Sequence, residues 1–268
     1  MDRFEWIATA AFGLEGVVAR ELARLGLDAK AENGGARFFG TFEDAFRANL
    51  HARCADRILL VMGRFEARSF EELFEGVRAL PWEDFIGERT RFPVNGKCAR
   101  SQLMSVRDCQ SITKKAIVER LRGRYRTDWF VEDAETVSID VALHGDIAQL
   151  TLDASGTALN RRGYRTWNGE APLRETLAAA LVTLSPWRPG MPLHDPMCGT
   201  GTLMIEAAMR MAHRAPGLTR EFAIESWPNM PREAFGAIRE QARAEFDPSR
   251  IEGISGSDID PEAVELAR

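Results

Sequence analysis

The chain has 268 residues, of which 45% are apolar and 28% charged, and this composition is typical of a folded protein and excludes a disordered one. No apolar run reaches the roughly 18 residues that a membrane-spanning helix needs. The acidic start, Met1-Asp2-Arg3-Phe4-Glu5, lacks the basic and apolar regions of a secretory signal. We therefore expect a cytoplasmic protein of about two domains with no membrane contact.

Cysteine and histidine usage argues against a metal site. The four cysteines, Cys54, Cys98, Cys109 and Cys198, form no C-x-x-C pair, and the four histidines show no ligand spacing. His51 lies three residues before Cys54, but two possible ligands do not make a zinc site. Scattered thiols fit a reducing compartment, so we expect no metal and no disulfide.

The net charge of −5 taken alone argues against a nucleic-acid partner, but the distribution of charge argues for one. Residues 89–126 contain two acidic side chains, so this segment carries +9 and the rest of the chain −14. A local basic patch on an acidic protein can hold a polyanion. The segment has eleven basic residues: Arg89, Arg91, Lys97, Arg100, Arg107, Lys114, Lys115, Arg120, Arg122, Arg124 and Arg126.

The first 65 residues predict a small α/β unit. Asn33-Gly34-Gly35 is a strong hairpin signal, and Gly26 stands where a helix C-terminal glycine belongs. Hydrophobic periodicity gives the order β-α-β-β-α-β, which is the split ferredoxin-like unit. The predicted elements are a strand at 5–11, a helix at 14–25, strands at 27–32 and 36–42, a helix at 42–52 and a strand at 57–65.

Residues 66–158 continue in the same style and form the predicted second region. Ser69 can cap a helix whose first turn contains Glu71 and Glu72. Gly145-Asp146 predicts a hairpin turn. We expect a helix at 70–80, a strand at 91–97, a basic helix at 105–121 and hairpin strands at 138–144 and 147–152.

Residues 159–268 predict a third region of alternating helices and strands, the beginning of a Rossmann-like domain. Residues 160–170 look like a polar linker, and Pro172 can start a helix at its first position. Residues 215–230 leave room for an insertion. We expect a helix at 172–184, a strand ending at 193–195, helices at 202–214 and 231–245, a strand at 251–258, and a last helix from 261 capped by Asp260.

The stretch Asp195-Pro196-Met197-Cys198-Gly199-Thr200-Gly201-Thr202 carries the chemistry. It follows a strand and precedes a helix, and its glycines let the backbone turn tightly and approach a ligand. Asp258 ends the next strand, where an acid in Rossmann-type sites binds a ribose. The pattern is neither G-x-G-x-x-G nor a P-loop, which disfavours nicotinamide and nucleoside triphosphate ligands.

Together these motifs identify a family by resemblance. The loop resembles the methyl-donor loop of class I methyltransferases, and the chain as a whole resembles the THUMP-domain RNA methyltransferases. Within them it is similar to the bacterial 23S rRNA guanine-N2 methyltransferases, which often carry the name N6-adenine-specific DNA methylase. The supporting segments are Phe92-Pro93-Val94-Asn95-Gly96-Lys97, the helix start from Ser105 to Ile117, Gly163-Tyr164-Arg165, the run from Gly169 to Leu177, and Ile205-Glu206-Ala207-Ala208.

The resemblance implies an enzyme that uses S-adenosylmethionine and has RNA as its partner, rRNA in preference to tRNA. Asp195, Gly199 and Gly201 would line the methionine end of the donor, and Asp258 would bind its ribose. Pro196, Cys198 and Thr202 belong to the same loop, where Cys198 is expected as a small residue and not as a nucleophile.

Other positions near the donor stay open. Thr176 or Arg174 would contact the donor carboxylate, or else begin an ordinary helix. Asp260 would assist Asp258 or only cap a helix. Glu206 is expected to be structural.

The basic segment supplies the expected RNA contacts. Lys97, Arg100, Lys114 and Lys115 are the candidates for phosphate contacts, which provide affinity and position more than sequence choice. The alternative for these residues is a solvated helix face. Arg161, Arg162 and Arg165 in the linker would extend the basic track.

No catalytic residue can be assigned. Amino methyltransferases of this kind use an Asn/Asp-Pro-Pro-Tyr/Phe motif, whose polar groups hold the target amine while its ring stacks on the flipped base. The chain has no such motif, and it ends soon after the second strand of the Rossmann-like region. We therefore expect residues 1–268 alone to lack turnover.

Two other functions remain to be weighed. The first is adenine-N6 methylation of DNA, against which the THUMP-like basic region argues. The second is a non-catalytic RNA-binding protein, against which the complete glycine loop and Asp258 argue.

Overall fold

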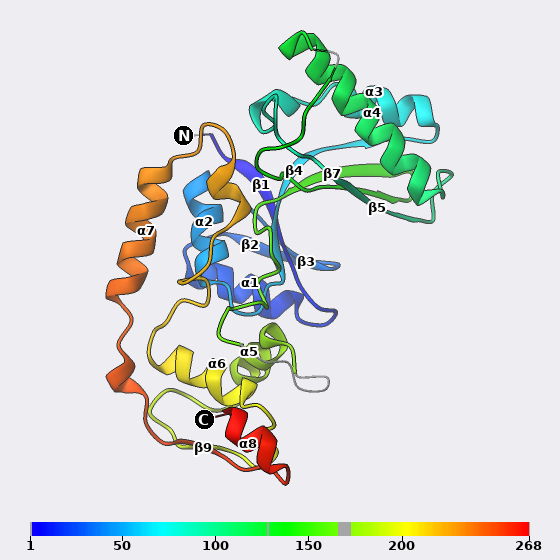
Figure 1. The fold of residues 1–268 in the computed structure, drawn as a ribbon. Helices are drawn as coiled ribbons and strands as arrows, with labels where there is room; N and C mark the ends of the chain where they lie inside the picture. Colours follow the sequence, from blue (N-terminus) through cyan, green and yellow to red (C-terminus); the bar gives the residue numbers. More distant parts are fainter. Residues whose placement is uncertain (1, 128, 166–172, 268) are drawn as a thin grey trace.

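The computed structural model describes residues 2–127, 129–165 and 173–267 (Figure 1). Short 3₁₀ turns at Trp82–Asp84, Ala223–Ser226 and Pro248–Arg250 join some of the regular elements. The helices and strands are, in chain order, β1 (Phe4–Thr9), α1 (Glu15–Arg24), β2 (Ala29–Glu32), β3 (Gly35–Gly40), α2 (Phe42–His51), β4 (Arg57–Glu66), α3 (Phe70–Arg78), β5 (Val94–Ala99), α4 (Val106–Tyr125), β6 (Ile139–His144), β7 (Ile147–Asp153), α5 (Glu175–Leu184), β8 (Leu193–Asp195), α6 (Thr202–Met211), α7 (Arg232–Ala244), β9 (Ile254–Gly256) and α8 (Pro261–Ala267).

The predicted ferredoxin-like unit is confirmed. Its strands follow the order β2-β3-β1-β4 with antiparallel pairing, and Gly34 takes the left-handed φ of 86° that its hairpin turn requires. Helix α2 begins with a capping box, because Thr41 accepts from the main-chain N–H of Asp44 and Asp44 accepts from that of Thr41. Trp6 and Phe38 are fully buried in the core of this unit.

The second region does not form a separate sheet. Strand β4 runs past the ferredoxin-like unit and pairs with β7, so one sheet of seven strands has the order β2-β3-β1-β4-β7-β6-β5. A bulge between Val61 and Gly63 interrupts β4 where the two regions meet. Such a bulge increases the local twist, and the sheet bends so that α1 and α2 cover one part while α3 and α4 cover the other (Figure 1). A shared strand fixes how the two regions sit on each other.

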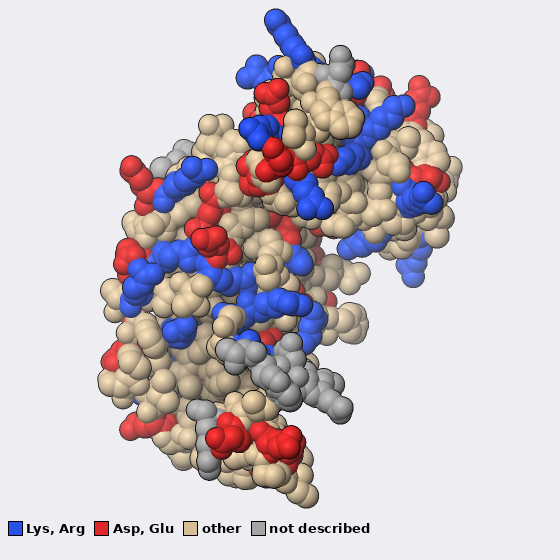
Figure 2. All heavy atoms as spheres, in the orientation of Figure 1, with Lys and Arg blue, Asp and Glu red and all other residues tan. Residues whose placement is uncertain are grey.

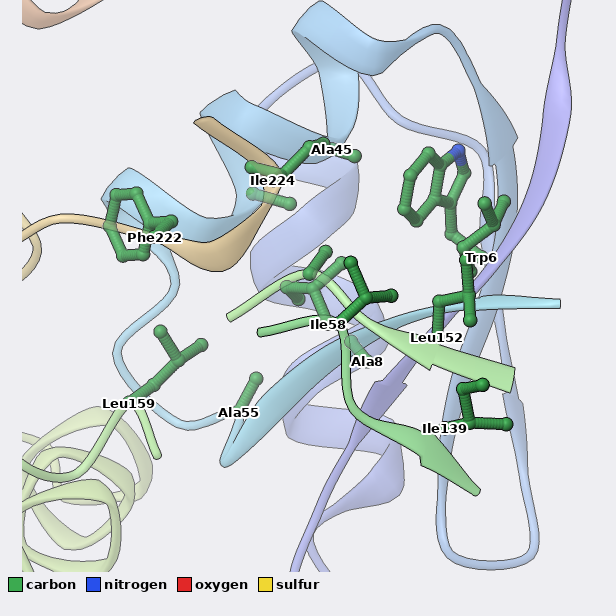
Figure 3. Close-up of a cluster of buried hydrophobic side chains, with 14 of the residues drawn as sticks. Trp6, Ala8, Ala45, Ala55, Ile58, Ile139, Leu152, Leu159, Phe222 and Ile224 are labelled. Carbon is green, nitrogen blue, oxygen red and sulfur yellow. The ribbon is translucent and has the colours of Figure 1, made fainter. Parts of the chain in front are cut away.

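Residues 215–244 clasp the ferredoxin-like unit, a role that the sequence did not reveal. Phe46 of α2 stacks on Phe235 of α7, with ring centroids 4.4 Å apart, and meets the edge of Phe222 at 5.7 Å. Ile224 donates its main-chain N–H to the carbonyl of Ala154 at 3.0 Å. Figure 3 shows Phe222 and Ile224 in the same buried cluster as Ala45 and Ile58. The predicted insertion is therefore part of the main hydrophobic core.

The third region has its own small core. Strands β8 and β9 pair in parallel, and α5 and α6 pack beside them around Val182, Trp187, Ala207 and Met211. Among the described residues no helix combines the length and the apolar character that crossing a membrane demands.

Several predicted boundaries in the third region were wrong. Helix α5 begins at Glu175, because Arg174 has the extended backbone of an N-cap residue, and the predicted start at Pro172 lies outside the described residues. Helix α6 ends at Met211 and not at 214. Strand β9 begins only at Ile254, because a 3₁₀ turn and Gly253, with a φ of 64°, precede it.

Trp227 tests the clasp. It is fully buried and packs edge-on against Phe85, with ring centroids 5.6 Å apart. We expect Trp227→Ala to destabilise the protein by about 3–5 kcal/mol, because it leaves a large cavity. Trp227→Phe should cost far less, since it keeps the ring and removes a buried indole N–H that has no partner among the described residues. Urea unfolding measures both, with the 79% exposed Trp129→Ala as control, and equal midpoints for Trp227→Ala and Trp129→Ala would contradict the clasp.

Candidate functional site

Main-chain hydrogen bonds join the loop between β8 and α6 to the end of β9. Ser257 donates its main-chain N–H to the carbonyl of Asp195 at 2.9 Å, and Cys198 donates its own to the carbonyl of Ser257 at 3.0 Å. These bonds continue the parallel pairing of β8 with β9, in which Asp195 is opposite Gly256. The carboxyl ends of the two strands therefore meet, and with them Asp195 and Asp258.

Glycines shape this loop. Gly199 has a φ of 50°, and no heavy atom lies within 4 Å of the place where its Cβ would stand. Gly201 is the N-cap of α6 with a φ of 78°. Gly256 is required for packing, because a Cβ there would lie 2.5 Å from the sulfur of Met204. The open space beside Gly199 leaves its backbone accessible to a ligand.

Asp258 is held as an ionised acceptor. Its two carboxylate oxygens accept main-chain N–H groups, one from Asp260 at 3.0 Å and one from Gly199 at 2.8 Å. These hydrogen bonds, that of Asp260 first, hold the pKa of Asp258 below its usual range. Asp260 itself accepts the main-chain N–H of Glu262 at 2.9 Å, which is the contact of a helix cap.

Cys198 is not poised to attack a substrate. Its side chain is buried, and burial first, then the charges of Asp258 and Asp195, raise the pKa of its thiol. The structure therefore agrees with a small loop residue and not with a nucleophile.

The described part of the linker, residues 160–165, contacts α6 through two arginines. The Arg165 guanidinium donates to the Thr202 hydroxyl at 2.7 Å and lies 3.5 Å from a carboxylate oxygen of Glu175. Arg162 is 4% exposed and forms a buried ion pair of 3.2 Å with Glu206. The expectation that Arg162 extends an RNA-binding track was wrong, because this side chain is enclosed by protein. Glu206 is structural, as expected.

The start of α5 is joined to the ferredoxin-like unit. The Thr176 hydroxyl donates to a carboxylate oxygen of Asp56 at 2.8 Å, and Arg174 lies 3.9 Å from the other oxygen. Asp56 was not singled out by the sequence, and nothing in its spacing could have shown this contact 120 residues along the chain. The predicted motif residues Gly169, Glu170, Ala171 and Pro172 lie outside the described residues.

The predicted phosphate-binding residues do not share one face. On β5, Gly96 and Cys98 point toward α4, where Gly96 approaches Gln110 and the Cys98 sulfur lies 3.8 Å from that of Cys109. Because side chains alternate along a strand, Lys97 points to the opposite face of the sheet. Lys114 and Lys115 lie on α4 itself.

Several of the eleven basic residues also have acidic partners that lie outside the counted segment. Lys114 forms an ion pair of 2.6 Å with Glu132 and lies over the ring of Phe92. Arg89 pairs with Asp133, and Arg120 with Glu83. Figure 2 accordingly shows red and blue side chains interleaved over the region of α3 and α4. Lys97, Arg100 and Arg107 are exposed and make no ion pair with the part of the chain that the structure describes.

Comparison with known families matches each of the three regions to a domain found in RNA methyltransferases. Residues 5–59 match the RlmL ferredoxin-like domain, residues 67–153 the THUMP domain, and residues 162–268 the RMKL-like methyltransferase domain. The Bacillus subtilis protein YpsC, named as a proposed RNA methyltransferase, is 43% identical over 270 residues, which cover 100% of this chain and 70% of that protein. The chain belongs to the THUMP-containing class I RNA methyltransferases.

Solved structures of this family agree. A protein of Listeria monocytogenes, titled a predicted N6-adenine-specific DNA methylase, has 46% identity and a TM-score of 0.95 over 100% of this chain and 70% of that one. SMU.472, titled a methyltransferase in complex with SAH, has 42% identity and a TM-score of 0.95 over 100% of this chain and 71% of that one. The predicted family, fold class and enzyme class are thus confirmed.

S-adenosylmethionine is the cofactor of this RNA methyltransferase. The residues present fit it, because the space beside Gly199 is open and each Asp258 oxygen, with one N–H accepted, keeps a lone pair for a ligand hydroxyl. The described residues hold no cluster of three potential metal ligands.

The ion pair between Arg162 and Glu206 generates a test of how the methyltransferase keeps its linker in place. We expect Glu206→Ala to destabilise the protein by about 3–5 kcal/mol, because it leaves the Arg162 charge buried and unpaired. The matched control is Glu240→Ala, which removes the partner of Arg243 on the surface of α7 and should cost less than about 1 kcal/mol. Urea unfolding compares the two, and similar losses would show that the buried pair has no special weight.

Proposed function

We propose that this RNA methyltransferase modifies the exocyclic N2 amine of guanine in large-subunit rRNA. The support is the resemblance of its motifs to that group of enzymes, together with the match of its first region to the RlmL ferredoxin-like domain. The observation that carries the proposal is a complete donor loop in a region that shares the main hydrophobic core with a THUMP region. RNA and methyl donor would then be held by regions that share one hydrophobic core.

The donor loop would divide its work between its two ends. Asp258 would bind the ribose hydroxyls of the donor through the free lone pairs of its carboxylate. Asp195, Gly199 and Gly201 would line the methionine end, with Pro196, Cys198 and Thr202 completing the loop. Thr176 stays a candidate for the carboxylate, although its hydroxyl is already donated to Asp56.

In methyl transfer the main task of the protein is to position the methyl donor and the target amine. When bound, the donor would supply an electrophilic methyl group on its sulfonium for the lone pair of the target amine, with S-adenosylhomocysteine as the leaving group and loss of the amine proton. The residues of this chain would hold the donor, keep Asp258 ionised and fix the loop through the bonds to β9. Transfer then depends on proximity and orientation, which can account for most of the rate enhancement.

The THUMP region would hold the RNA. Lys97 and Arg100 are the proposed phosphate contacts best supported by the structure, since both are exposed and free of ion pairs with the described residues. Lys114 and Lys115 stay proposals, and the ion pair of Lys114 with Glu132 makes that residue the weaker one. A preference for rRNA over tRNA and a cytoplasmic location belong to the same proposal.

Adenine-N6 methylation of DNA is the second candidate, because the Listeria monocytogenes relative is titled a DNA methylase. The THUMP match favours RNA. A purely RNA-binding role is the third, and measurable donor affinity would count against it.

Asp258 tests the donor site. We expect Asp258→Asn to weaken SAH binding by about 10- to 100-fold, because hydrogen bonds to a charged acceptor are lost. Asp260→Asn should change it less than about twofold, because asparagine also caps helices. Isothermal titration calorimetry measures both affinities. Wild-type SAH affinity in Asp258→Asn would show that Asp258 does not bind the donor.

The same titration, repeated at several pH values, tests the ionisation of Asp258. Because the pKa of Asp258 is lowered, its carboxylate stays ionised as the pH falls, and SAH affinity should stay level from about pH 7 to about pH 5. A decline within this window would mean that another group controls binding.

The product identifies the reaction. The product of the whole gene is incubated with S-adenosylmethionine and, separately, unmodified large-subunit rRNA, tRNA and DNA, and the nucleosides are separated by mass spectrometry. We expect N2-methylguanosine from rRNA. N6-methyladenine from DNA as the main product would establish the second candidate instead, and RNA binding with neither donor binding nor product would favour the third.

A further inference from the structure

One aromatic side chain stands almost entirely in solvent at the tip of the ferredoxin-like unit. Phe12, in the turn between β1 and α1, is 95% exposed. Phenylalanine has no polar atom, so the exposed ring makes no hydrogen bond of its own and its apolar face is available for stacking.

Hydrogen bonds fix the backbone of the turn that carries Phe12. Gly13 has a φ of 86° and donates its N–H to a carboxylate oxygen of Glu15 at 2.9 Å. The other oxygen of Glu15 accepts the N–H of Gly34 at 3.4 Å, and Ala10 donates to the carbonyl of Gly34 at 3.0 Å. The turn is thereby fixed to the β2–β3 hairpin, and its ring is presented at a defined position.

A short series of contacts leads from this turn to the donor loop. Thr9, just before the turn, accepts the main-chain N–H of Asp56 at 2.8 Å. Asp56 holds Arg174 and Thr176 at the start of α5. In Figure 1 the turn that follows β1 is drawn near α5, and α1 contacts α5.

The start of α5 in turn reaches the donor loop. Arg165 donates to the carbonyl of Leu173 at 3.4 Å, beside that helix start, and to the hydroxyl of Thr202 at 2.7 Å. Thr202 is the first residue of α6, after the glycine loop. The Phe12 turn is therefore linked to the start of α6 by a continuous series of contacts.

We propose that Phe12 is a stacking platform for an unpaired base of the RNA substrate, beside the base that receives the methyl group. The inference rests on the proposed function in one respect, that the substrate is RNA. Reaching a base amine requires that base to leave its stack, which also unstacks a neighbour and leaves its face free. An exposed ring that is linked to the donor loop through the start of α5 offers that face a new partner, as aromatic side chains do in single-stranded nucleic-acid sites.

A cation in the same series of contacts fits the same partner. The Arg174 side chain is 62% exposed, and its 3.9 Å distance from Asp56 leaves guanidinium donors free for a phosphate. Apolar ring and cation together match a nucleotide, whereas an apolar peptide would have no use for the charge. Stacking would supply affinity without reading sequence, and phosphate contact would supply the salt dependence.

The test is filter binding of an unmodified large-subunit rRNA transcript to the whole protein. We expect Phe12→Ala to weaken binding about tenfold, since stacking on one ring accounts for a loss of that order. Phe12→Tyr, which keeps the ring, should bind within about twofold of the wild type. Phe70→Ala, which removes a 38% exposed ring at the start of α3, is the matched control and should leave binding unchanged.

Salt dependence separates stacking from charge. Phe12→Ala should leave the slope of log affinity against log salt unaltered, whereas Arg174→Ala should make it shallower by about one unit or less. SAH affinity and the thermal midpoint should not move in Phe12→Ala, because the ring contacts neither donor nor core. Wild-type RNA affinity in Phe12→Ala, or an equal loss in Phe12→Tyr, would overturn the proposal. These measurements do not depend on which base is methylated, so a product other than N2-methylguanosine would refute the proposed function and leave the Phe12 result standing.

Discussion

A buried ion pair joins the ferredoxin-like unit to the methyltransferase region, and the placement of the donor loop depends on it. Arg162 pairs with Glu206 of α6 and also donates to the main-chain carbonyls of Leu159 and Arg53. One guanidinium thus binds the linker, the ferredoxin-like unit and the helix of the donor loop. Because either charge alone would be costly to bury, the pair is stable only when all three segments are in place. Arg165 extends the same linker to Thr202.

A shared strand and a clasp make this junction rigid. Strand β4 belongs to the ferredoxin-like unit at one end and pairs with β7 of the THUMP region at the other. Residues 215–244 return from the methyltransferase region and bury Phe222, Ile224 and Trp227 in the core of the first two. A linker alone would leave the RNA-holding and donor-holding regions free to move against each other. Here the sheet joins the first two regions and the core continues into the third, so a substrate held by one region is placed for the other.

Local patterns in the sequence predicted the elements well, and long-range contacts explain where it failed. The ferredoxin-like order followed from periodicity and from Asn33-Gly34-Gly35, because both act over a few residues. The donor loop was equally visible, since Asp195, Gly199 and Gly201 lie within seven residues of each other. The clasp was not, because Phe222 and Trp227 in an irregular segment have no periodicity to read. Nor was Asp56, whose partner Thr176 is 120 residues away.

The distribution of charge shows most clearly that a local sequence pattern does not predict long-range contacts. A count along residues 89–126 gives +9, but the fold brings in acids from outside that window, among them Glu83, Glu132 and Asp133. An ion pair between half-exposed side chains adds little stability, yet it cancels the charge that a phosphate would meet. The alternation of β5 then separates Lys97 from the lysines of α4 by the thickness of the sheet. Affinity for RNA is therefore set by which cations the fold leaves unpaired and on one face, a property that no segment of the sequence has by itself.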